Sequence, residues 1–197
     1  MKMENQIEKS LQYLSTPDGL LKFGESVART SIRRHGHIDT SLFVVCEDHA
    51  EIVLPGPLDS EKNVEDFAEV ARLICISSGA KGAMLICHAW CTTVAPGEQA
   101  GANPADSANG QEIVWLHTET SDGSKFMRWP VMRSHDGKMI ELGPGKIEES
   151  AKFQGGFGRL LPLKYPTPEL RQIAKQTLIS KGLLGVNADM PPMFSPN

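Results

Sequence analysis

The sequence predicts an α+β fold, in which a single, largely antiparallel sheet of strands of mixed length carries packed helices and ends in a C-terminal-half β-meander. The first observation is a pair of Asp-Gly turns, Asp122-Gly123 and Asp136-Gly137, fourteen residues apart between β-rich runs. Two-residue Asp-Gly loops are typical of tight hairpins, so these turns predict three consecutive antiparallel strands. The second is the predicted order of elements, α-α-β-β-α-β-β-β-β-α, which favours one sheet with helices packed on it.

The N-terminal half is predicted to contain three helices and three strands. In order, these are helices at about 7–14 and 17–34, a hairpin of strands 42–47 and 51–54, a helix at 61–78 and a long strand at 82–94. Thr16 as N-cap and Pro17 in the first turn start the second helix. The hairpin is expected to turn at Asp48-His49-Ala50. The strand at 82–94 is apolar on both faces, which predicts a central position in the sheet.

The C-terminal half is predicted to begin with a long neutral loop at 95–110, followed by the meander, a Gly-rich connector and a last helix between Thr167 and Gly182. We therefore expect one domain over residues 1–182. Its parts are the N-terminal helices (1–34), the core sheet with its helix (35–143), and the connector with the C-terminal helix (144–182), and an irregular tail (183–197) follows it.

Pairing the strands outward from the Asp-Gly turns predicts a register and two faces for the meander. The predicted partners are Ser121 with Ser124, His117 with Arg128, Trp115 with Pro130, Glu112 with Arg133, Arg133 with Ile140 and Val131 with Leu142. The core face then holds Val114, Leu116, Met127, Trp129, Val131, Ile140 and Leu142. The other face holds Ile113, Trp115, Phe126, Met132 and Met139 among polar residues. It is too apolar to be fully wet, so we expect helices, the tail or a second subunit to cover part of it.

Composition narrows the classes of function. The 197 residues are 40% hydrophobic and carry a net charge of −4, which provides no basic excess for nucleic acid. The sequence shows no signal peptide and no membrane-spanning run, so we expect a cytoplasmic protein with neither nucleic acid nor membrane as partner. The four cysteines, at 46, 75, 87 and 91, lie among apolar neighbours and are expected to be reduced core residues.

The candidate catalytic residues are His88, Glu112 and Arg133. The predicted register pairs Glu112 with Arg133, and His88 shares a face of the long strand with Trp90. If that strand neighbours the one that starts near Glu112, all four side chains can line one pocket, where an imidazole and a carboxylate can do general acid/base work. The preferred interpretation is structural: a cross-strand ion pair and a hydrogen-bonded core histidine.

His35 and His37 are the metal-like pair of the sequence, because two imidazoles close to Asp39 can bind zinc. The pair resembles the His-x-His of the JAMM metalloprotease family, with Asp48 at a plausible distance downstream. No proline follows His37, however, and Val45 occupies the position where that motif has serine. We therefore favour a polar turn between a helix and a strand, and expect neither a metal nor a cofactor.

A wider resemblance covers residues 35–143. A Phe-Val strand, a helix, a strand ending in His88-Ala89-Trp90, a Pro-containing loop, Gln111-Glu112 and a meander with Arg133 together resemble a group of small uncharacterised proteins of bacteria and their phages. That group typically has Glu-Ala-Trp and Arg-Glu at the two motifs. The resemblance implies a bacterial or phage α+β protein of the cytoplasm. It transfers no activity and no catalytic residue.

Two functional hypotheses follow. The first is a non-enzymatic binding or self-assembling module, whose simplest form is a homo-oligomer. Its interface or pocket residues are then Trp90, Trp115, Phe126 and Met132. The alternative is a small hydrolase or ligand-processing enzyme with its site at His88, Glu112 and Arg133. A concave pocket around His88 and Glu112 favours the enzyme, whereas groups that satisfy one another on a flat face favour the module.

Overall fold

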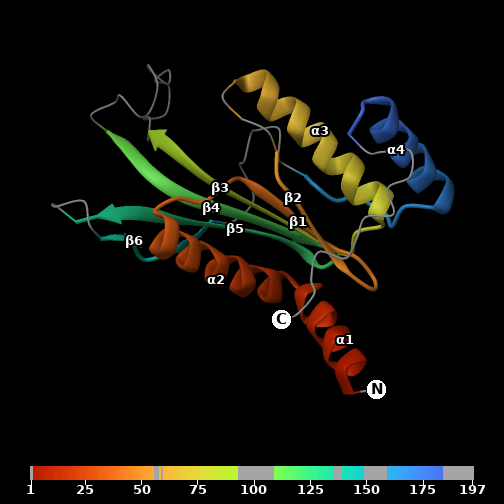
Figure 1. The fold of residues 1–197 in the computed structure, drawn as a ribbon, viewed down its shortest axis with the longest axis horizontal. Coiled ribbons are helices and arrows are strands. Elements are labelled where there is room, and N and C mark those ends of the chain that lie inside the picture. The colour runs from red at the N-terminus through yellow and green to blue at the C-terminus, as the bar shows by residue number, and fades with distance from the viewer. Residues whose placement is uncertain are drawn as a thin grey trace.

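The described residues form four helices and a seven-stranded antiparallel sheet (Figure 1), which confirms the predicted α+β fold. The computed structural model describes residues 2–55, 58, 60–92, 109–134, 139–148 and 159–183. In chain order the elements are α1 (Lys2–Leu14), α2 (Pro17–His35), β1 (Ser41–Val45), β2 (Ala50–Val53), α3 (Glu61–Ser78), β3 (Gly82–Thr92), β4 (Gly110–Thr120), β5 (Gly123–Arg133), β6 (Ile140–Leu142), β7 (Lys146–Glu148) and α4 (Pro168–Ser180). None of the helices in these ranges is long and apolar enough to cross a membrane.

The sheet has the strand order β2-β1-β3-β4-β5-β6, and β7 also pairs with β5. Strand β3 therefore lies inside the sheet, between β1 and β4, as its two apolar faces predict. Helix α2 lies along one face, α3 lies over the other, and α4 rests beside α3 (Figure 1). The sheet is thus sandwiched between helices, and each face has its own core.

The α2 face of the sheet is closely packed against the helix. Leu116 and Trp129 are fully buried there together with Leu20 and Ile32 of α2. At Gly24 a Cβ atom would lie only 2.6 Å from a Leu116 methyl group, so glycine lets the helix approach the sheet closely. The predicted core face of the meander is confirmed, because Val114, Leu116, Trp129 and Leu142 are buried in this core and Met127, Val131 and Ile140 pack against it.

The α3 face combines an apolar core with buried polar groups. Phe67 and Cys75 of α3 pack there against Leu85, and residues 160–161 join the same core. The buried carboxylate of Glu119 fixes that segment by accepting hydrogen bonds from the backbone N–H groups of Leu160 (2.6 Å) and Leu161 (3.2 Å). Part of the second meander face is therefore covered by the chain itself.

The C-terminal helix is not the cover of that face. Helix α4 packs on α3, where Ala174 and Leu178 are buried. Leu170 and Ile173 are exposed instead. The segment before α4, held by Glu119, takes the position that sequence analysis allowed for the helix or the tail.

The predicted register of the first hairpin is wrong by two residues. Thr120 pairs with Gly123, so the loop is Ser121-Asp122 and not Asp122-Gly123, and His117 faces Phe126 in place of Arg128. The Thr120 hydroxyl accepts a hydrogen bond from the Asp122 N–H, and Gly123, at φ 138°, is the residue with positive φ. Ser121 and Ser124, Trp115 and Pro130, and Glu112 and Arg133 are likewise not direct partners. A shift of two leaves every side chain on its predicted face.

The second hairpin has the predicted register, since Val131 pairs with Leu142 and Arg133 with Ile140. Its Asp136-Gly137 turn lies outside the described residues, as do residues 95–108 of the loop, residues 149–158 of the Gly-rich connector and the tail beyond Leu183. Strand β7 was not predicted: residues 146–148 belong to the sheet, although sequence analysis placed them in the connector. Gly143-Pro144-Gly145 separates β7 from β6, and three residues carry too little pattern to be recognised as a strand.

Candidate functional site

The predicted cluster of His88, Glu112 and Arg133 is assembled at one end of the sheet. Strands β3 and β4 are neighbours, with Trp90 opposite Glu112 and His88 opposite Val114. Both pairs lie on the α2 face, because Val114 belongs to the core under α2. Arg133 lies on the same face of β5 and reaches Glu112 diagonally instead of from the directly opposite position.

The Glu112 carboxylate is the centre of this sheet-end cluster. It accepts a hydrogen bond from Arg133 Nε (2.7 Å), a second from Arg133 Nη2 (2.5 Å), and lies 2.9 Å from His88 Nε2. Only 10% of the Glu112 side chain is exposed, against 45% for Arg133. The bidentate guanidinium, more than the imidazole, holds the pKa of Glu112 below its usual range although burial opposes this.

Each charge in the sheet-end cluster is therefore matched by another member of it. Glu112 is ionised at neutral pH, and Arg133 is positioned to balance it. The imidazole of His88 is oriented by Glu112, as a general base would be, but the carboxylate is already occupied by Arg133. Trp90, next to the cluster in the sheet, is about half exposed. The arrangement favours a structural ion network over a reaction centre.

Of the four predicted interface residues, Trp90 lies on the α2 face, whereas Trp115, Phe126 and Met132 lie on the α3 face and differ in burial. Phe126 is buried and stacks on His117 at a centroid distance of 4.0 Å, and Trp115 packs partly against the α3 core. Met132 and Met139, by contrast, are 57% and 62% exposed. The chain closes the middle of this face and leaves its outer end, near β6, open to solvent.

In the part of the chain that the structure describes, no third possible ligand atom lies close to both His35 and His37. Their rings are 6.4 Å apart, and His37 Nδ1 lies 3.0 Å from the backbone oxygen of His35. Asp39 approaches His37 only to 3.7 Å. Both histidines are exposed at the end of α2, where Gly36 ends the helix in the left-handed conformation. The segment is a polar turn between helix α2 and strand β1.

A different group of ligand types, which sequence analysis missed, lies at the β1–β2 turn. Cys46, His49 and Glu51 place a sulfur, a ring nitrogen and a carboxylate oxygen within 4.8 Å of one another. The predicted turn, Asp48-His49-Ala50, has three residues and would separate Cys46 from His49. The real turn is Glu47-Asp48: Val45 pairs with Ala50, and Cys46 N–H donates to the His49 carbonyl at 2.9 Å.

The tighter turn explains why the three side chains meet. Cys46 stands opposite His49, and Glu51 stands opposite Val44, whose side chain lies in the α3 core together with that of Cys46. Successive residues of a strand alternate between faces, so His49 and Glu51 share the α3 face with Cys46. The signal in the sequence is the spacing Cys-x2-His-x-Glu around a turn. This spacing brings the three side chains together on one face only when the loop has two residues.

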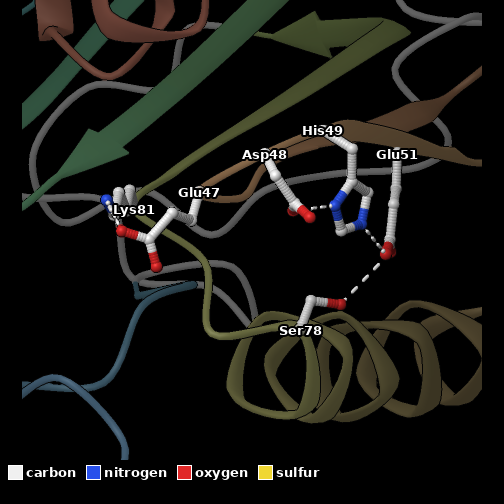
Figure 2. A network of polar contacts seen from close by, with 6 residues as sticks. All are labelled: Glu47, Asp48, His49, Glu51, Ser78 and Lys81. Atoms are coloured by element: carbon white, nitrogen blue, oxygen red, sulfur yellow. Dashed lines mark hydrogen bonds and ion pairs between the residues drawn. The ribbon is translucent and has the colours of Figure 1, made fainter. Parts of the chain in front are cut away.

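A polar network surrounds His49 and Glu51 (Figure 2). His49 Nδ1 lies 2.6 Å from Asp48 Oδ1, and Nε2 lies 2.9 Å from Glu51 Oε1. The Ser78 hydroxyl at the end of α3 donates to Glu51 Oε2 at 3.2 Å. The neighbouring pair of Lys81 and Glu47, 3.0 Å apart, points away from this network.

The pKa values of Cys46 and His49 are both raised, for different reasons. Burial, reinforced by the nearby Glu51 and Asp48 carboxylates, raises the pKa of the Cys46 thiol to about 12. The hydrogen bonds to Asp48 and Glu51 raise the pKa of His49 above its ordinary value. A buried, protonated thiol is a poor nucleophile, so the turn is not built for covalent catalysis by Cys46.

Comparison of the chain with protein-family models, curated proteins and solved structures returns no match.

Proposed function

We propose that this protein is a non-enzymatic binding module that acts by self-association. The observation that carries the proposal is the open outer end of the α3 face, where Met132 and Met139 are more than half exposed. Met132 pairs with Glu141, and Met139 lies two residues before Glu141 on the same face, so the two methionines are diagonal neighbours. Flexible apolar side chains grouped at a sheet edge are suited to burial against a second copy.

The state of the candidate catalytic residues supports the same proposal. His88, Glu112 and Arg133 satisfy one another and leave no carboxylate oxygen of Glu112 without a partner. The four cysteines are free thiols, which supports a reducing compartment such as the cytoplasm. The resemblance of residues 35–143 to small bacterial and phage proteins supports a bacterial or phage origin.

The proposal is tested by the oligomeric state. Light scattering over a micromolar dilution series should show a concentration-dependent dimer for the wild type and a folded monomer for the double variant Met132→Lys, Met139→Lys. Ile173→Lys is the matched control, because Ile173 is exposed to a similar degree on α4. It should leave the dimer intact. A wild-type monomer at every concentration, or a dimer lost in the control and kept in the double variant, contradicts the proposal.

A second candidate function is hydrolysis or another ligand-processing reaction at the sheet-end cluster. The observation that favours it is the 2.9 Å contact of His88 with Glu112, which orients an imidazole in the way a general base requires. A panel of chromogenic ester and phosphoester substrates tests it. Turnover that is lost in His88→Gln and retained in His37→Gln supports this function, and absence of turnover in the wild type argues against it.

A further inference from the structure

The geometry points to a binding site for one zinc-like divalent cation at the β1–β2 turn, with Cys46 Sγ, His49 Nε2 and Glu51 Oε1 as its protein ligands. This site is independent of the proposed self-association, since it lies at the opposite edge of the sheet from Met132 and Met139, on β1 and β2 instead of β5 and β6.

The ligand set fits the chemistry of zinc. Thiolate, imidazole and carboxylate are the three side-chain ligands that Zn²⁺ takes in proteins, with bonds of about 2.0 to 2.3 Å. In a tetrahedral site such bonds place the ligand atoms roughly 3.3 to 3.6 Å apart. One possible ligand atom from each of the three side chains lies within 4.8 Å of the other two, and His49 Nε2 and Glu51 Oε1 are 2.9 Å apart. Side-chain rotations are therefore enough to close the site, while the backbone of the turn keeps its hydrogen bonds.

The groups behind the ligands are those that metal sites use. A zinc-bound histidine usually donates its other ring N–H to a carboxylate, which fixes the tautomer and the orientation of the ring. Asp48 is placed for this role, because its Oδ1 is 2.6 Å from His49 Nδ1 while Nε2 points to Glu51. Ser78 in turn donates to Oε2 of Glu51, and the proposed ion takes the place between Oε1 and His49 Nε2, which are now in contact with each other.

Access and burial also agree with a metal site. Cys46 forms the inner side of the proposed site, since it is buried in the α3 core, whereas half of the His49 side chain is exposed. Glu51 lies between them with 14% of its side chain exposed. An ion can enter from the side of His49, and the half-exposed rim leaves the fourth position to water. Coordination displaces the proton of the thiol, because a thiol bound to zinc is the thiolate.

The rival explanation of the same residues is a surface ion network with a buried cysteine beneath it. In that case His49 is an imidazolium held between two carboxylates, and Cys46 is a packing residue. The two explanations differ in their dependence on Cys46: the ion network needs Asp48 and Glu51 and makes no use of the sulfur, whereas the metal site needs the sulfur as a ligand.

Metal binding by the full chain, purified without a tag and freed of metal with a chelator, tests the proposal. Zinc affinity is measured by competition with a chromophoric chelator, and cobalt is used as a probe because a thiolate ligand gives a charge-transfer band in the near ultraviolet. We expect one zinc per chain and such a cobalt band. His49→Ala and Cys46→Ser should each weaken zinc binding more than about 100-fold, and Asp48→Asn should weaken it roughly 10- to 100-fold.

Two matched controls locate the site. Glu47→Gln removes the neighbouring carboxylate of the same turn, and His37→Ala removes a histidine of the pair at the end of α2; both should bind zinc as the wild type does. Because Cys46 is buried, circular dichroism must show that Cys46→Ser is folded, and the surface variant His49→Ala gives an answer if it is not. Binding below one zinc per chain, a cobalt complex without the thiolate band, or unchanged affinity in His49→Ala overturns the proposal.

Discussion

The sheet-end cluster and the cluster at the β1–β2 turn are built from similar residues, but they differ in the group that balances the charge of the glutamate. At the sheet end, Glu112 is nearly buried and is shared by Arg133 and His88, so a permanent cation of the chain already balances the carboxylate. At the β1–β2 turn, no arginine or lysine occupies the Glu51 carboxylate among the contacts of the described residues; a histidine and a hydroxyl do. The first cluster is therefore a closed network, and the second is an arrangement in which a metal ion can replace the proton of an imidazole.

This difference teaches that residue type alone does not identify a functional site. Each cluster has a histidine 2.9 Å from a glutamate. What separates them is the third partner: a guanidinium completes one, and a buried thiol lies beside the other. We accordingly expect changes at the sheet end to affect stability and changes at the turn to affect metal binding.

The largest expected effect is stabilisation by zinc. At a free zinc concentration 100 times the dissociation constant, binding should raise the free energy of unfolding by about 2.7 kcal/mol, because only the folded state has the site. Denaturant unfolding with and without zinc measures it. Glu112→Gln should gain as much from zinc as the wild type does, and His49→Ala, with its more than 100-fold weaker binding, should gain less than about 0.4 kcal/mol. If both variants lost the stabilisation by zinc to the same extent, the distinction between the two clusters would be wrong.

The next largest effect is the loss of stability in Glu112→Gln. The substitution leaves Arg133 and His88 without their shared carboxylate, and we expect the free energy of unfolding at pH 7 to fall by about 2 kcal/mol, the range for hydrogen bonds to charged groups. The folded-state pKa of Glu112 is lowered, chiefly by Arg133. This stabilisation is therefore present above the unfolded-state pKa of roughly 4.3 and is lost as pH falls through the folded-state value.

Urea unfolding of the wild type and of Glu112→Gln from pH 7 down to pH 3 checks this prediction. The difference between the two proteins should shrink as the pH falls below about 4. A difference that stays constant with pH would mean that the ionised carboxylate of Glu112 is not what stabilises the sheet end.

Arg133→Gln should have a smaller effect, about 1 kcal/mol, because this side chain is nearly half exposed and Glu112 keeps His88 as a partner. The substitution should also raise the pKa of Glu112, which an NMR titration of the side-chain carboxyl carbon measures. Lys125→Gln is a suitable control: it breaks the exposed ion pair with Asp18, far from Glu112 in the fold, and should leave that pKa unchanged. A pKa of Glu112 that does not rise in Arg133→Gln would contradict the closed-network description.

The smallest expected effect is the loss of stability in metal-free His49→Ala, which we place below about 1 kcal/mol. Half of the His49 side chain is exposed, and exposed ion pairs contribute little. Chemical unfolding in the presence of a chelator measures it. A loss as large as that of Glu112→Gln would show that the turn cluster is structural, like the sheet end.

The sequence predicts most of the fold because its local signals are strong. Thr16 caps α2, Gly79 ends α3, and strict alternation along β3 and β4 places His88 and Glu112 on one face before any contact is known. The predicted sheet-end cluster depends only on that alternation. It therefore survives the error of two residues in the first hairpin, since an even shift preserves the faces.

The turn cluster was missed because loop length, and not residue pattern, decides it. Glu47-Asp48 and Asp48-His49-Ala50 are both acceptable turns by composition, and only the first sets Cys46 opposite His49. Cys46 also continues an apolar run, which predicts a core residue, and the side chain is indeed buried. Ser78 is distant in sequence and reaches Glu51 only because α3 returns across the sheet.

X-ray absorption at the zinc edge of the stoichiometric complex tests the central distinction most directly, because it reports the ligands of the ion itself. The proposed site predicts one sulfur at about 2.3 Å and nitrogen or oxygen neighbours at about 2.0 to 2.2 Å, with the sulfur contribution lost in Cys46→Ser. A spectrum with nitrogen and oxygen ligands alone, unchanged in Cys46→Ser, would contradict the account and leave the turn as an ion network like the one at the sheet end.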